Sequence, residues 1–433
     1  MQFLHIIQYV KTEVILVSKL IISGKRKMEG EIDVQGAKNA VLPILAAAVL
    51  SDGKNVIYNC PHLRDVDITI KVLENLGCRV NWNGACMEVD SSTASGYTIP
   101  DDLMRQMRSS IIFLGAIIAK CKKAEISMPG GCEIGNRPID LHIKALRQLG
   151  VQITESHGII HCLAEKLSPA EIHLDFPSVG ATENIMLASC MTDGITTIEN
   201  AAREPEIVDL QCFLNRMGAK IKGAGTDTIT IEGVHKLYGV EHTIMPDRIV
   251  AATYLACAAA TAGTVMLKNV NSSHMGAMIN TLKDMGCKLY TEKNKIILLP
   301  AKKLKSIGTI KTMPYPGFPT DIQSPFMALA TQCSGTSVFV ENIFENRFQH
   351  IEELVRMGAD IKTDGRVAVV IGKNKLEGAK VVAKELRGGA ALIIAAAAAD
   401  GTSEIENVKF IDRGYERIEK VLSSCGINIK RKE

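Results

Sequence analysis

Hydrophobic and polar positions follow two periods along this chain, and the change from one period to the other recurs six times. Each repeat contains an apolar stretch rich in small residues, then a turn, then a period-two pattern typical of a strand. Clear examples of the apolar stretch begin at Asn39, Ala181, Asp321 and Ala390. These stretches lack the polar side of a surface helix, so we expect buried central helices with sheets around them. We expect the repeated unit to run helix, strand, strand, helix, strand.

A short phrase marks the same place in every repeat: a leucine or methionine near the end of a helix, a glycine, then a strand. Its glycines are Gly77, Gly150, Gly218, Gly286, Gly358 and Gly426. They lie 68 to 73 residues apart, which is too far for a solenoid of small repeats. The pattern predicts an α/β protein with a pseudo-six-fold repeat, divided into two similar lobes of three units.

Composition excludes several classes of protein. The net charge is +3, from 50 Lys and Arg against 47 Asp and Glu, and no basic stretch is interleaved with aromatic residues, which argues against nucleic-acid binding. None of the twelve cysteines forms a CxxC pair, which favours a reducing cytoplasm over a disulfide or zinc framework. The longest apolar stretches are shorter than the roughly 20 residues of a membrane span. We expect a soluble, cytoplasmic protein.

Cations stand at the start of four of the six predicted core helices, at Lys38, Arg108, Arg248 and Arg387. A cation there faces the positive end of the helix dipole, at a cost of about 0.3–1 kcal/mol. If the helices of each lobe run parallel, their N-termini face one another across a cleft and form a site for a multiply charged anion. A solvated surface charge is the ordinary explanation for any one of them, but their repetition favours the anion site.

The segment from Pro129 to His142, PGGCEIGNRPIDLH, is the most unusual in the chain. Pro129 and the three glycines, Gly130, Gly131 and Gly135, disfavour regular structure and place Cys132 on a loop. A thiol near Arg137 and a cationic cleft should have a pKa below its ordinary value of about 8.5, and therefore be reactive. A surface cysteine without a function is the alternative.

The third and fifth core helices open with similar sequences, FPSVGATENIM and FPTDIQSPFMAL. In the first, Ser178 can cap the helix and leave the amides of residues 179–181 open to a phosphate. In the second, we expect Thr320 to be the cap, which leaves Asp321 available as a base. An acid that merely favours the helix start is the alternative for Asp321.

Six segments of the chain resemble the UDP-N-acetylglucosamine 1-carboxyvinyltransferases: GAKNAVLPILAAAVL, PGGCEIGNRPIDLHI, FPSVGATENIMLA, FPTDIQSPFMAL, ENRFQHIEEL and LRGGAALIIAA. The resemblance runs from about Lys19 to the C-terminus. It implies a transferase that moves the enolpyruvyl group of phosphoenolpyruvate to the 3'-hydroxyl of UDP-N-acetylglucosamine and releases phosphate. This is the first committed step of peptidoglycan synthesis, on which cell-wall biogenesis, cell shape and cell division depend, and a target of fosfomycin. No metal or organic cofactor is implied.

The family also implies a particular architecture, two inside-out α/β barrels with parallel core helices and outer sheets. One lobe would comprise residues 39–245, and the other residues 17–38 together with 246–433. Residues 1–16 would be an N-terminal extension, since charges interrupt their apolar run and no signal-peptide cleavage site follows. We expect no partner beyond the small-molecule substrates, and the sequence is compatible with a monomer.

The resemblance assigns roles to individual residues. Cys132 would protonate the methylene carbon of phosphoenolpyruvate and can form a phosphothioketal with it, while Asp321 would take the proton of the sugar hydroxyl. Lys38 and Asn39 would contact phosphoenolpyruvate, and Arg137 and Arg387 would bind its phosphate and carboxylate. The residues expected to hold the nucleotide sugar are Arg108, Arg137, Pro138, Ile139, Asp140, Leu141, Phe176, Pro177, Ser178, Val179, Asp321 and Ile343. Two glycines after Arg387 depart from the pattern and are expected to loosen that turn.

Three alternatives are open at this point. A shikimate-phosphate enolpyruvyl transferase shares the architecture but has no loop cysteine of this kind. A DNA sliding clamp also repeats an α/β unit six times, but it needs basic helices around its hole, and these are alanine-rich. A regulatory paralogue with weak activity would keep the same residues. A phosphate-release assay with each of the two acceptors, UDP-N-acetylglucosamine and shikimate 3-phosphate, separates the two enzymes.

Overall fold

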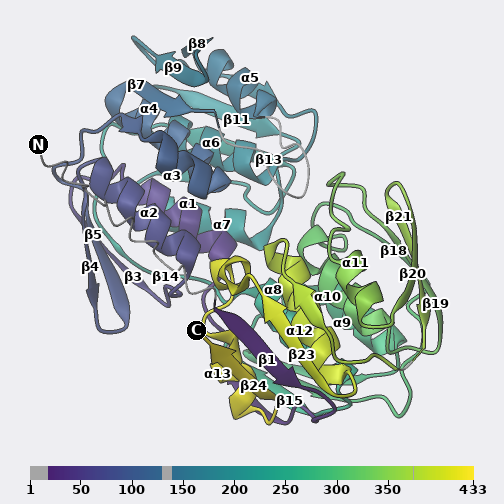
Figure 1. The fold of residues 1–433 in the computed structure, drawn as a ribbon. Coiled ribbons are helices and arrows are strands. Elements are labelled where there is room, and N and C mark those ends of the chain that lie inside the picture. The colour runs from purple at the N-terminus through teal and green to yellow at the C-terminus, as the bar shows by residue number, and fades with distance from the viewer. Residues whose placement is uncertain (1–17, 129–138, 374) are drawn as a thin grey trace, which may run out of the picture.

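The structure is a computed structural model that describes residues 18–128, 139–373 and 375–433. Within these residues the chain forms six four-stranded sheets on the outside and helices at the centre (Figure 1). In each sheet an edge strand runs parallel to its neighbour, and the remaining pairs are antiparallel. The α/β class, the central helices and the six-fold repeat predicted from the sequence are confirmed.

Three sheets surround the first group of helices. In spatial order their strands are β14 (Glu241–Thr243), β3 (Lys54–Tyr58), β5 (Cys86–Asp90) and β4 (Arg79–Asn83); β6 (Thr98–Ile99), β7 (Lys123–Ser127), β9 (Ile159–Leu163) and β8 (Gln152–Ser156); and β10 (Glu171–His173), β11 (Ile195–Glu199), β13 (Thr228–Glu232) and β12 (Lys220–Lys222). The helices are α1 (Lys38–Ala48), α2 (Arg64–Asn75), α3 (Asp101–Gln106), the 3₁₀ helix η1 (Arg108–Ile112), α4 (Phe113–Cys121), α5 (Asp140–Gln148), α6 (Val179–Ser189) and α7 (Pro205–Arg216).

Three further sheets surround the second group. Their strands are β16 (Lys288–Glu292), β17 (Lys295–Leu299), β15 (Val265–Lys268) and β2 (Gly30–Asp33); β18 (Thr309–Lys311), β19 (Gly335–Val340), β21 (Val367–Gly372) and β20 (Asp360–Asp364); and β22 (Lys380–Val382), β23 (Thr402–Glu406), β1 (Lys19–Ser23) and β24 (Asn428–Lys432). The helices are α8 (Arg248–Ala260), η2 (Ser272–Met275), α9 (Gly276–Asp284), α10 (Thr320–Ala330), α11 (Ile351–Arg356), α12 (Leu386–Ala398), η3 (Val408–Arg413) and α13 (Ile418–Ser424).

The order of elements within a unit differs from the predicted one. The third unit, for example, runs β10, α6, β11, α7, β12, β13, so a second helix separates the first two strands after the core helix. The expected order was wrong because the strand after the repeated glycine forms a hairpin with the strand that follows it. The repeated glycines themselves all have positive φ, between 88° and 109°, as a glycine that ends a helix requires.

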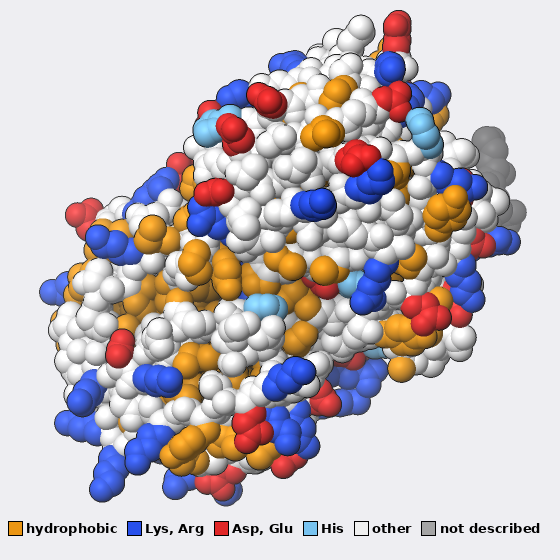
Figure 2. All heavy atoms as spheres, turned by 180° about the vertical axis from the view of Figure 1, so that it is seen from behind, with side chains coloured by type: hydrophobic (Ala, Val, Ile, Leu, Met, Phe, Trp, Pro, Cys, Tyr) orange, Lys and Arg blue, Asp and Glu red, His pale blue; other side chains and the backbone are white. Residues whose placement is uncertain are grey.

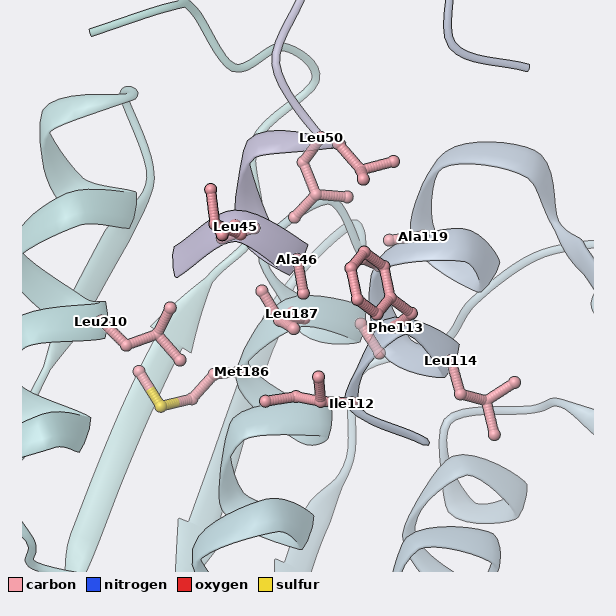
Figure 3. Packing of buried hydrophobic residues seen from close by; sticks show 14 of the residues in the cluster. Leu45, Ala46, Leu50, Ile112, Phe113, Leu114, Ala119, Met186, Leu187 and Leu210 are labelled. Carbon is pink, nitrogen blue, oxygen red and sulfur yellow. The ribbon is translucent and has the colours of Figure 1, made fainter. Parts of the chain in front are cut away.

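Small side chains allow the central helices to pack closely. α4 packs on α6, and α10 packs on both α8 and α12. Residues 386–397 of α12 are all buried, including the alanine run at its C-terminal end. In the first group, Leu45 and Ala46 of α1, Phe113 of α4 and Leu187 of α6 lie together (Figure 3). These helices are apolar on every side because they are covered on every side.

The buried apolar residues form two separate clusters. The first contains residues between 37 and 244, and the second contains residues 20–34 and 249–429. The chain passes between them twice, after β2 and after β14. The two passages pair with each other, since Ala37 N donates to Met245 O (2.8 Å) and Asp247 N donates to Gln35 O (2.9 Å). We call these paired passages, residues 34–37 and 244–247, the crossing.

Of the helices in the described ranges, none is both long enough and apolar enough to cross a bilayer.

Candidate active site

Four core helices from the two clusters meet at their N-termini. The amide of Lys38, the first residue of α1, donates to Oδ2 of Asp247, the N-cap of α8 (3.1 Å). Nδ2 of Asn39 lies 3.4 Å from Oδ2 of Asp321 in α10, and Nη2 of Arg387 in α12 donates to the same oxygen (3.2 Å). The starts of α1, α8, α10 and α12 therefore converge.

Asp321 is held by donors from three elements. Its Oδ1 accepts from Nη2 of Arg347 (3.0 Å), and its Oδ2 accepts from Arg387 and Asn39. The arrangement fixes the carboxylate between two buried guanidinium groups and an amide from the other cluster. About a quarter of the Asp321 side chain is exposed, so the carboxylate can still be reached.

Thr320 is not the cap of α10, and that prediction was wrong. The N-cap is Pro319, which offers no side-chain hydrogen bond, and Thr320 is the first helical residue. Its hydroxyl donates to Oε2 of the buried Glu341 (3.0 Å). Oε1 of Glu341 accepts from the amide of Ile343 (2.8 Å), so this carboxylate connects the start of α10 to the turn after β19.

Arg387 is almost completely buried, with 2% of its surface exposed. Burial would lower its pKa, but interactions with Tyr415, Asp321 and Asp247 outweigh burial and raise the pKa above its ordinary value. The guanidinium lies 5.4 Å from the ring centre of Tyr415. Its Nη2 donates to Asp321, and its Nε and Nη1 are buried beside Tyr415, so this permanent cation is held in place at the start of α12.

The glycines after Arg387 do not loosen α12, contrary to the expectation. Glu385 caps the helix by accepting from the amides of Arg387 (2.7 Å) and Gly388. A Cβ atom at Gly389 would lie 2.6 Å from Cγ1 of Ile411, so glycine is needed there for η3 to pack on α12. The first turn of α12 is therefore firmly held.

Lys38 and Arg413 share a buried carboxylate. Nζ of Lys38 lies 3.2 Å from Oδ2 of Asp65, and Nε of Arg413 lies 2.8 Å from its Oδ1. Burial would raise the pKa of Asp65, but the charges of Lys38 and Arg413 lower it below its ordinary value. Burial lowers the pKa of Lys38. The charges of Arg413 and Arg387 also lower it, whereas the charge of Asp65 raises it. Asp65 thus holds two cations of the site in place and opposes the lowering of the Lys38 pKa.

Two segments expected to hold the nucleotide sugar lie together through α5 and α6. Ser178 caps α6 by accepting from the amide of Ala181 (3.4 Å), which confirms the predicted cap. Nδ1 of His142 in α5 lies 2.7 Å from Nδ2 of Asn184 in α6. A Cβ atom at Gly180 would come within 3.1 Å of the His142 ring, so the helix starts are in close contact. The segments that precede or form these helix starts are residues 139–141 and 176–179. In these segments Phe176 is exposed and Ile139 is half-buried.

Arg248 does not belong to the cation set, and that part of the sequence interpretation was wrong. Its Nε and Nη2 donate to Oε1 (2.9 Å) and Oε2 (3.2 Å) of Glu206. Both side chains are buried, and the pair joins α8 to α7 across the two clusters. Arg248 is therefore neutralised by a carboxylate that the spacing of the core helices could not reveal.

Several predicted residues lie outside the description. Cys132, Arg137 and Pro138 fall in residues 129–138, and of Arg108 only the backbone, at the start of η1, is described. Among the described residues the cysteines are free thiols, most of them buried, as expected for small core residues. Burial raises the pKa of Cys162 and of Cys190 to about 12, so these thiols are unreactive.

Sequence reasoning missed Asp65, Glu341, Arg347 and Arg413. A signal existed for Arg347, which lies inside the segment ENRFQHIEEL. Asp65 follows Arg64 at the start of an amphipathic helix, like many surface acids, and Arg413 lies far from every motif. Nothing in the local sequence could have identified these two.

Comparison with known proteins identifies the class. Residues 22–422 match the family model of EPSP synthase (3-phosphoshikimate 1-carboxyvinyltransferase). The enolpyruvyl transferase NikO from Streptomyces tendae has a similar structure, with a TM-score of 0.87 over 96% of this chain and 99% of that chain at 23% identity. EPSP synthase from Acinetobacter baumannii gives a TM-score of 0.73 over 96% of this chain and 100% of the other at 19% identity. The fold is that of the enolpyruvyl transferases.

Sequence relatives narrow the assignment. UDP-N-acetylglucosamine 1-carboxyvinyltransferase 2 of Caldanaerobacter subterraneus subsp. tengcongensis is 55% identical over 95% of this chain and 99% of its own length. The UDP-N-acetylglucosamine 1-carboxyvinyltransferase of Halothermothrix orenii is 49% identical over 95% of this chain and 99% of its own. The chain therefore belongs to the EPSP synthase family and, within it, to the UDP-N-acetylglucosamine 1-carboxyvinyltransferases.

Proposed function

We propose that this chain transfers the enolpyruvyl group of phosphoenolpyruvate to the 3'-hydroxyl of UDP-N-acetylglucosamine, with release of phosphate, in the cytoplasmic stage of peptidoglycan synthesis. The observation that carries the proposal is the position of Asp321. This carboxylate is oriented by Arg347 and Arg387 and lies 3.4 Å from the amide nitrogen of Asn39 in the other cluster. The Asp321 carboxylate, which can accept a proton, therefore lies among cations from both clusters.

Phosphoenolpyruvate carries a phosphate and a carboxylate, and it requires several preorganised cations. Lys38 and Arg413 are held by Asp65, and Arg387 is held by Asp321. Fixed cations stabilise the anion without reorganising when it binds, and they can stabilise the charge on the departing phosphate. We assign the phosphoenolpyruvate site to this group, together with Arg137 from the loop.

The reaction requires one proton delivered to carbon and another removed from oxygen, on different sides of the reacting groups. Asp321 would accept the proton of the sugar hydroxyl as its oxygen attacks C2 of phosphoenolpyruvate. Cys132 would deliver a proton to the methylene carbon, which gives a tetrahedral ketal. Loss of a proton from the methyl group and departure of phosphate then restore the double bond in the product.

The nucleotide sugar would lie along the starts of α5 and α6, with residues 139–141 and 176–179 around it and Ile343 on the opposite side. The capped start of α6 offers backbone amides to the diphosphate. We propose that residues 39–245 form one lobe, that residues 17–38 and 246–433 form the other, and that they close about the crossing. Closure would bring Cys132 toward Asp321 and exclude water.

The test combines purified protein, phosphoenolpyruvate and each of two acceptors, and it follows phosphate release. We expect release with UDP-N-acetylglucosamine and none with shikimate 3-phosphate. Cys132→Ser should abolish release, while Cys132→Asp should retain part of it because a carboxylic acid can donate a proton. Cys121→Ser is the matched control and should be fully active.

Release with shikimate 3-phosphate alone would assign the chain to the other branch of the family. No release with either acceptor, from folded protein, would favour the regulatory paralogue. Full activity of Cys132→Ser would remove the thiol from the mechanism.

A further inference from the structure

Asn184 is a buried polar residue beside the proposed nucleotide-sugar site, and the proposed reaction gives it no role. Charged side chains are spread over the surface of the molecule, as the face in Figure 2 shows, whereas Asn184 lies in the second turn of α6 with 0% of its surface exposed. Burying a polar side chain costs free energy unless its hydrogen bonds are made. The bonds of Asn184 therefore show what this side chain holds in place.

The side-chain amide of Asn184 makes hydrogen bonds with three other elements. Its Oδ1 accepts from the backbone amide of Gly115 in α4 (2.6 Å), and its Nδ2 donates to the carbonyl of Ile111 in η1 (3.0 Å). Nδ2 also lies 2.7 Å from Nδ1 of His142, in the first turn of α5. A backbone N–H can only donate and a carbonyl can only accept, so these partners determine which end of the Asn184 amide is the oxygen.

This orientation determines where His142 carries its proton. Nδ2 of Asn184 has two hydrogens, and because Ile111 accepts one of them, the other is donated to Nδ1 of His142. Nδ1 is then an acceptor, and the proton of the neutral ring lies on Nε2. An imidazolium ring, with a proton on both nitrogens, would set two donors against each other. Asn184 thus selects one neutral form of His142.

The protonated edge of the His142 ring lies against the first turn of α6. A Cβ atom at Gly180 would come within 3.1 Å of Cε1 and 3.4 Å of Nε2 of this ring. Gly180 is the second residue of α6, and the first amides of a helix have no partner within the helix. The Nε2–H of His142 therefore lies beside the helix start that the proposed function assigns to the diphosphate.

The elements that Asn184 joins are those whose starts carry the residues expected to hold the nucleotide sugar. Arg108 begins η1, residues 139–141 lead into α5, and residues 176–179 lead into α6. The contact with α4, which follows η1 directly, is close: a Cβ atom at Gly115 would lie 2.3 Å from the backbone oxygen of Asn184. A single buried amide thus connects the three segments.

We propose that Asn184 is a positioning residue for the nucleotide sugar, which holds the starts of η1, α5 and α6 together and keeps the proton of His142 on Nε2. The inference rests on the proposed function, because it concerns the site assigned there to UDP-N-acetylglucosamine. Asn184 is fully buried and acts through its partners, so that the site is ordered before the substrate binds. Lys38 and Arg387 begin other helices, α1 and α12, so phosphoenolpyruvate should be affected far less.

Calorimetry of UDP-N-acetylglucosamine binding to the full-length protein tests the positioning role. Asn184→Ala removes all three bonds and adds no atom. The matched control is Asn55→Ala in β3: Asn55 is equally buried, and its amide bonds to Ser51 (2.7 Å) and Val240 (3.2 Å), which lie outside η1, α5 and α6. We expect Asn184→Ala to weaken the nucleotide sugar about tenfold, or about 1.4 kcal/mol, and Asn55→Ala to weaken it less than twofold. The KM for phosphoenolpyruvate should change less than twofold in both variants.

Nitrogen NMR of isotope-labelled histidine tests the proton position independently of activity. Wild-type His142, assigned by comparison with His142→Gln protein, should show a protonated Nε2 and an unprotonated Nδ1. Asn184→Asp keeps an acceptor for Gly115 but has no N–H for His142, so a proton should appear on Nδ1. The same variant should show the loss of nucleotide-sugar affinity, so the test does not depend on the folding of Asn184→Ala alone. Asn55→Asp should leave the His142 signals unchanged.

Two results would overturn the positioning role: equal affinity of wild type and the Asn184 variants for UDP-N-acetylglucosamine, or an equal loss of affinity in Asn55→Ala. An Nδ1 of His142 that stays unprotonated in Asn184→Asp would overturn the assignment of the ring proton. Failure of the proposed function gives a different result, because the wild-type protein itself would then not bind UDP-N-acetylglucosamine. The histidine spectrum would still decide whether Asn184 sets the form of His142.

Discussion

The buried carboxylate of Asp65 allows a quantitative test of how the site is held together. Asp65 and Asp67 lie in the same first turn of α2, where both favour the positive end of the helix dipole. Asp65 is fully buried between Lys38 and Arg413, whereas Asp67 is exposed. Asp65→Asn and Asp67→Asn therefore form a matched pair, in which the helix contribution is shared and the buried ion pairs belong to Asp65 alone.

The expected difference follows from the distances. Nζ of Lys38 and Nε of Arg413 lie 3.2 Å and 2.8 Å from the two oxygens of Asp65. At an effective dielectric constant of about 20, two charges 4 Å apart attract each other by about 4 kcal/mol. Removing one partner of a buried pair costs about 3–5 kcal/mol, because the other charge remains buried. Asp65→Asn should lose that much free energy of unfolding, whereas Asp67→Asn should change it little, because burial raises the pKa of Asp67 and offsets the dipole contribution of about 0.3–1 kcal/mol.

The measurement is denaturant unfolding followed by circular dichroism, repeated across a range of pH. The folded-state pKa of Asp65 lies below its unfolded value, so its stabilisation is complete above the ordinary aspartate pKa of about 3.9 and is lost as pH falls toward the folded value. The gap between the wild type and Asp65→Asn should therefore shrink below about pH 4. Because Asp65 opposes the lowering of the Lys38 pKa, the variant should also lose phosphoenolpyruvate affinity at a lower alkaline pH.

Equal losses in the two variants would refute this reasoning, since they would show that the buried pairs contribute nothing beyond the helix dipole. A gap that stays constant down to pH 2 would show that Asp65 is not the titrating group. A loss of stability with an unchanged alkaline limit for phosphoenolpyruvate binding would separate Asp65 from the charge state of Lys38.

Three further predictions concern the site. Glu341→Gln should lower turnover at least tenfold and the free energy of unfolding by about 2–3 kcal/mol, because the carboxylate that binds Thr320, the residue before Asp321, is lost. Steady-state kinetics and denaturant unfolding measure the two effects, and an unchanged turnover would contradict the positioning role of Glu341. Lys38→Ala should weaken phosphoenolpyruvate by about 2–3 kcal/mol and the nucleotide sugar far less, as calorimetry can show, and equal effects on the two ligands would count against the anion site. Fosfomycin should alkylate Cys132 faster when UDP-N-acetylglucosamine is present, with Cys162 as an unreactive control in the same mass spectra, and an unchanged rate would argue against ligand-induced closure.

Much of the fold followed from local patterns. Stretches of small apolar residues predicted buried helices, and the repeated glycines predicted helix ends with positive φ. Both features depend only on residues close to one another in the sequence. The cap at Ser178 was predicted for the same reason. Thr320 is not a cap because α10 already begins at Thr320, whose hydroxyl donates to Glu341, 21 residues away in the chain. The order of elements within a unit failed because strand pairing, a non-local interaction, decides which segments form a hairpin.

The sequence by itself determined the six-fold α/β repeat, the helix starts that carry charge, and the family to which those segments are similar. Only the tertiary structure decided which charges act together. Arg248 and Arg387 occupy equivalent positions at the starts of core helices, yet Arg248 pairs with Glu206 of α7, whereas Arg387 pairs with Asp321 at the site. Asp65 and Arg413, 348 residues apart, became neighbours through the packing of α2 against η3. Electrostatic interactions depend on distance in space and on burial, and neither quantity can be predicted from the spacing of residues along a chain.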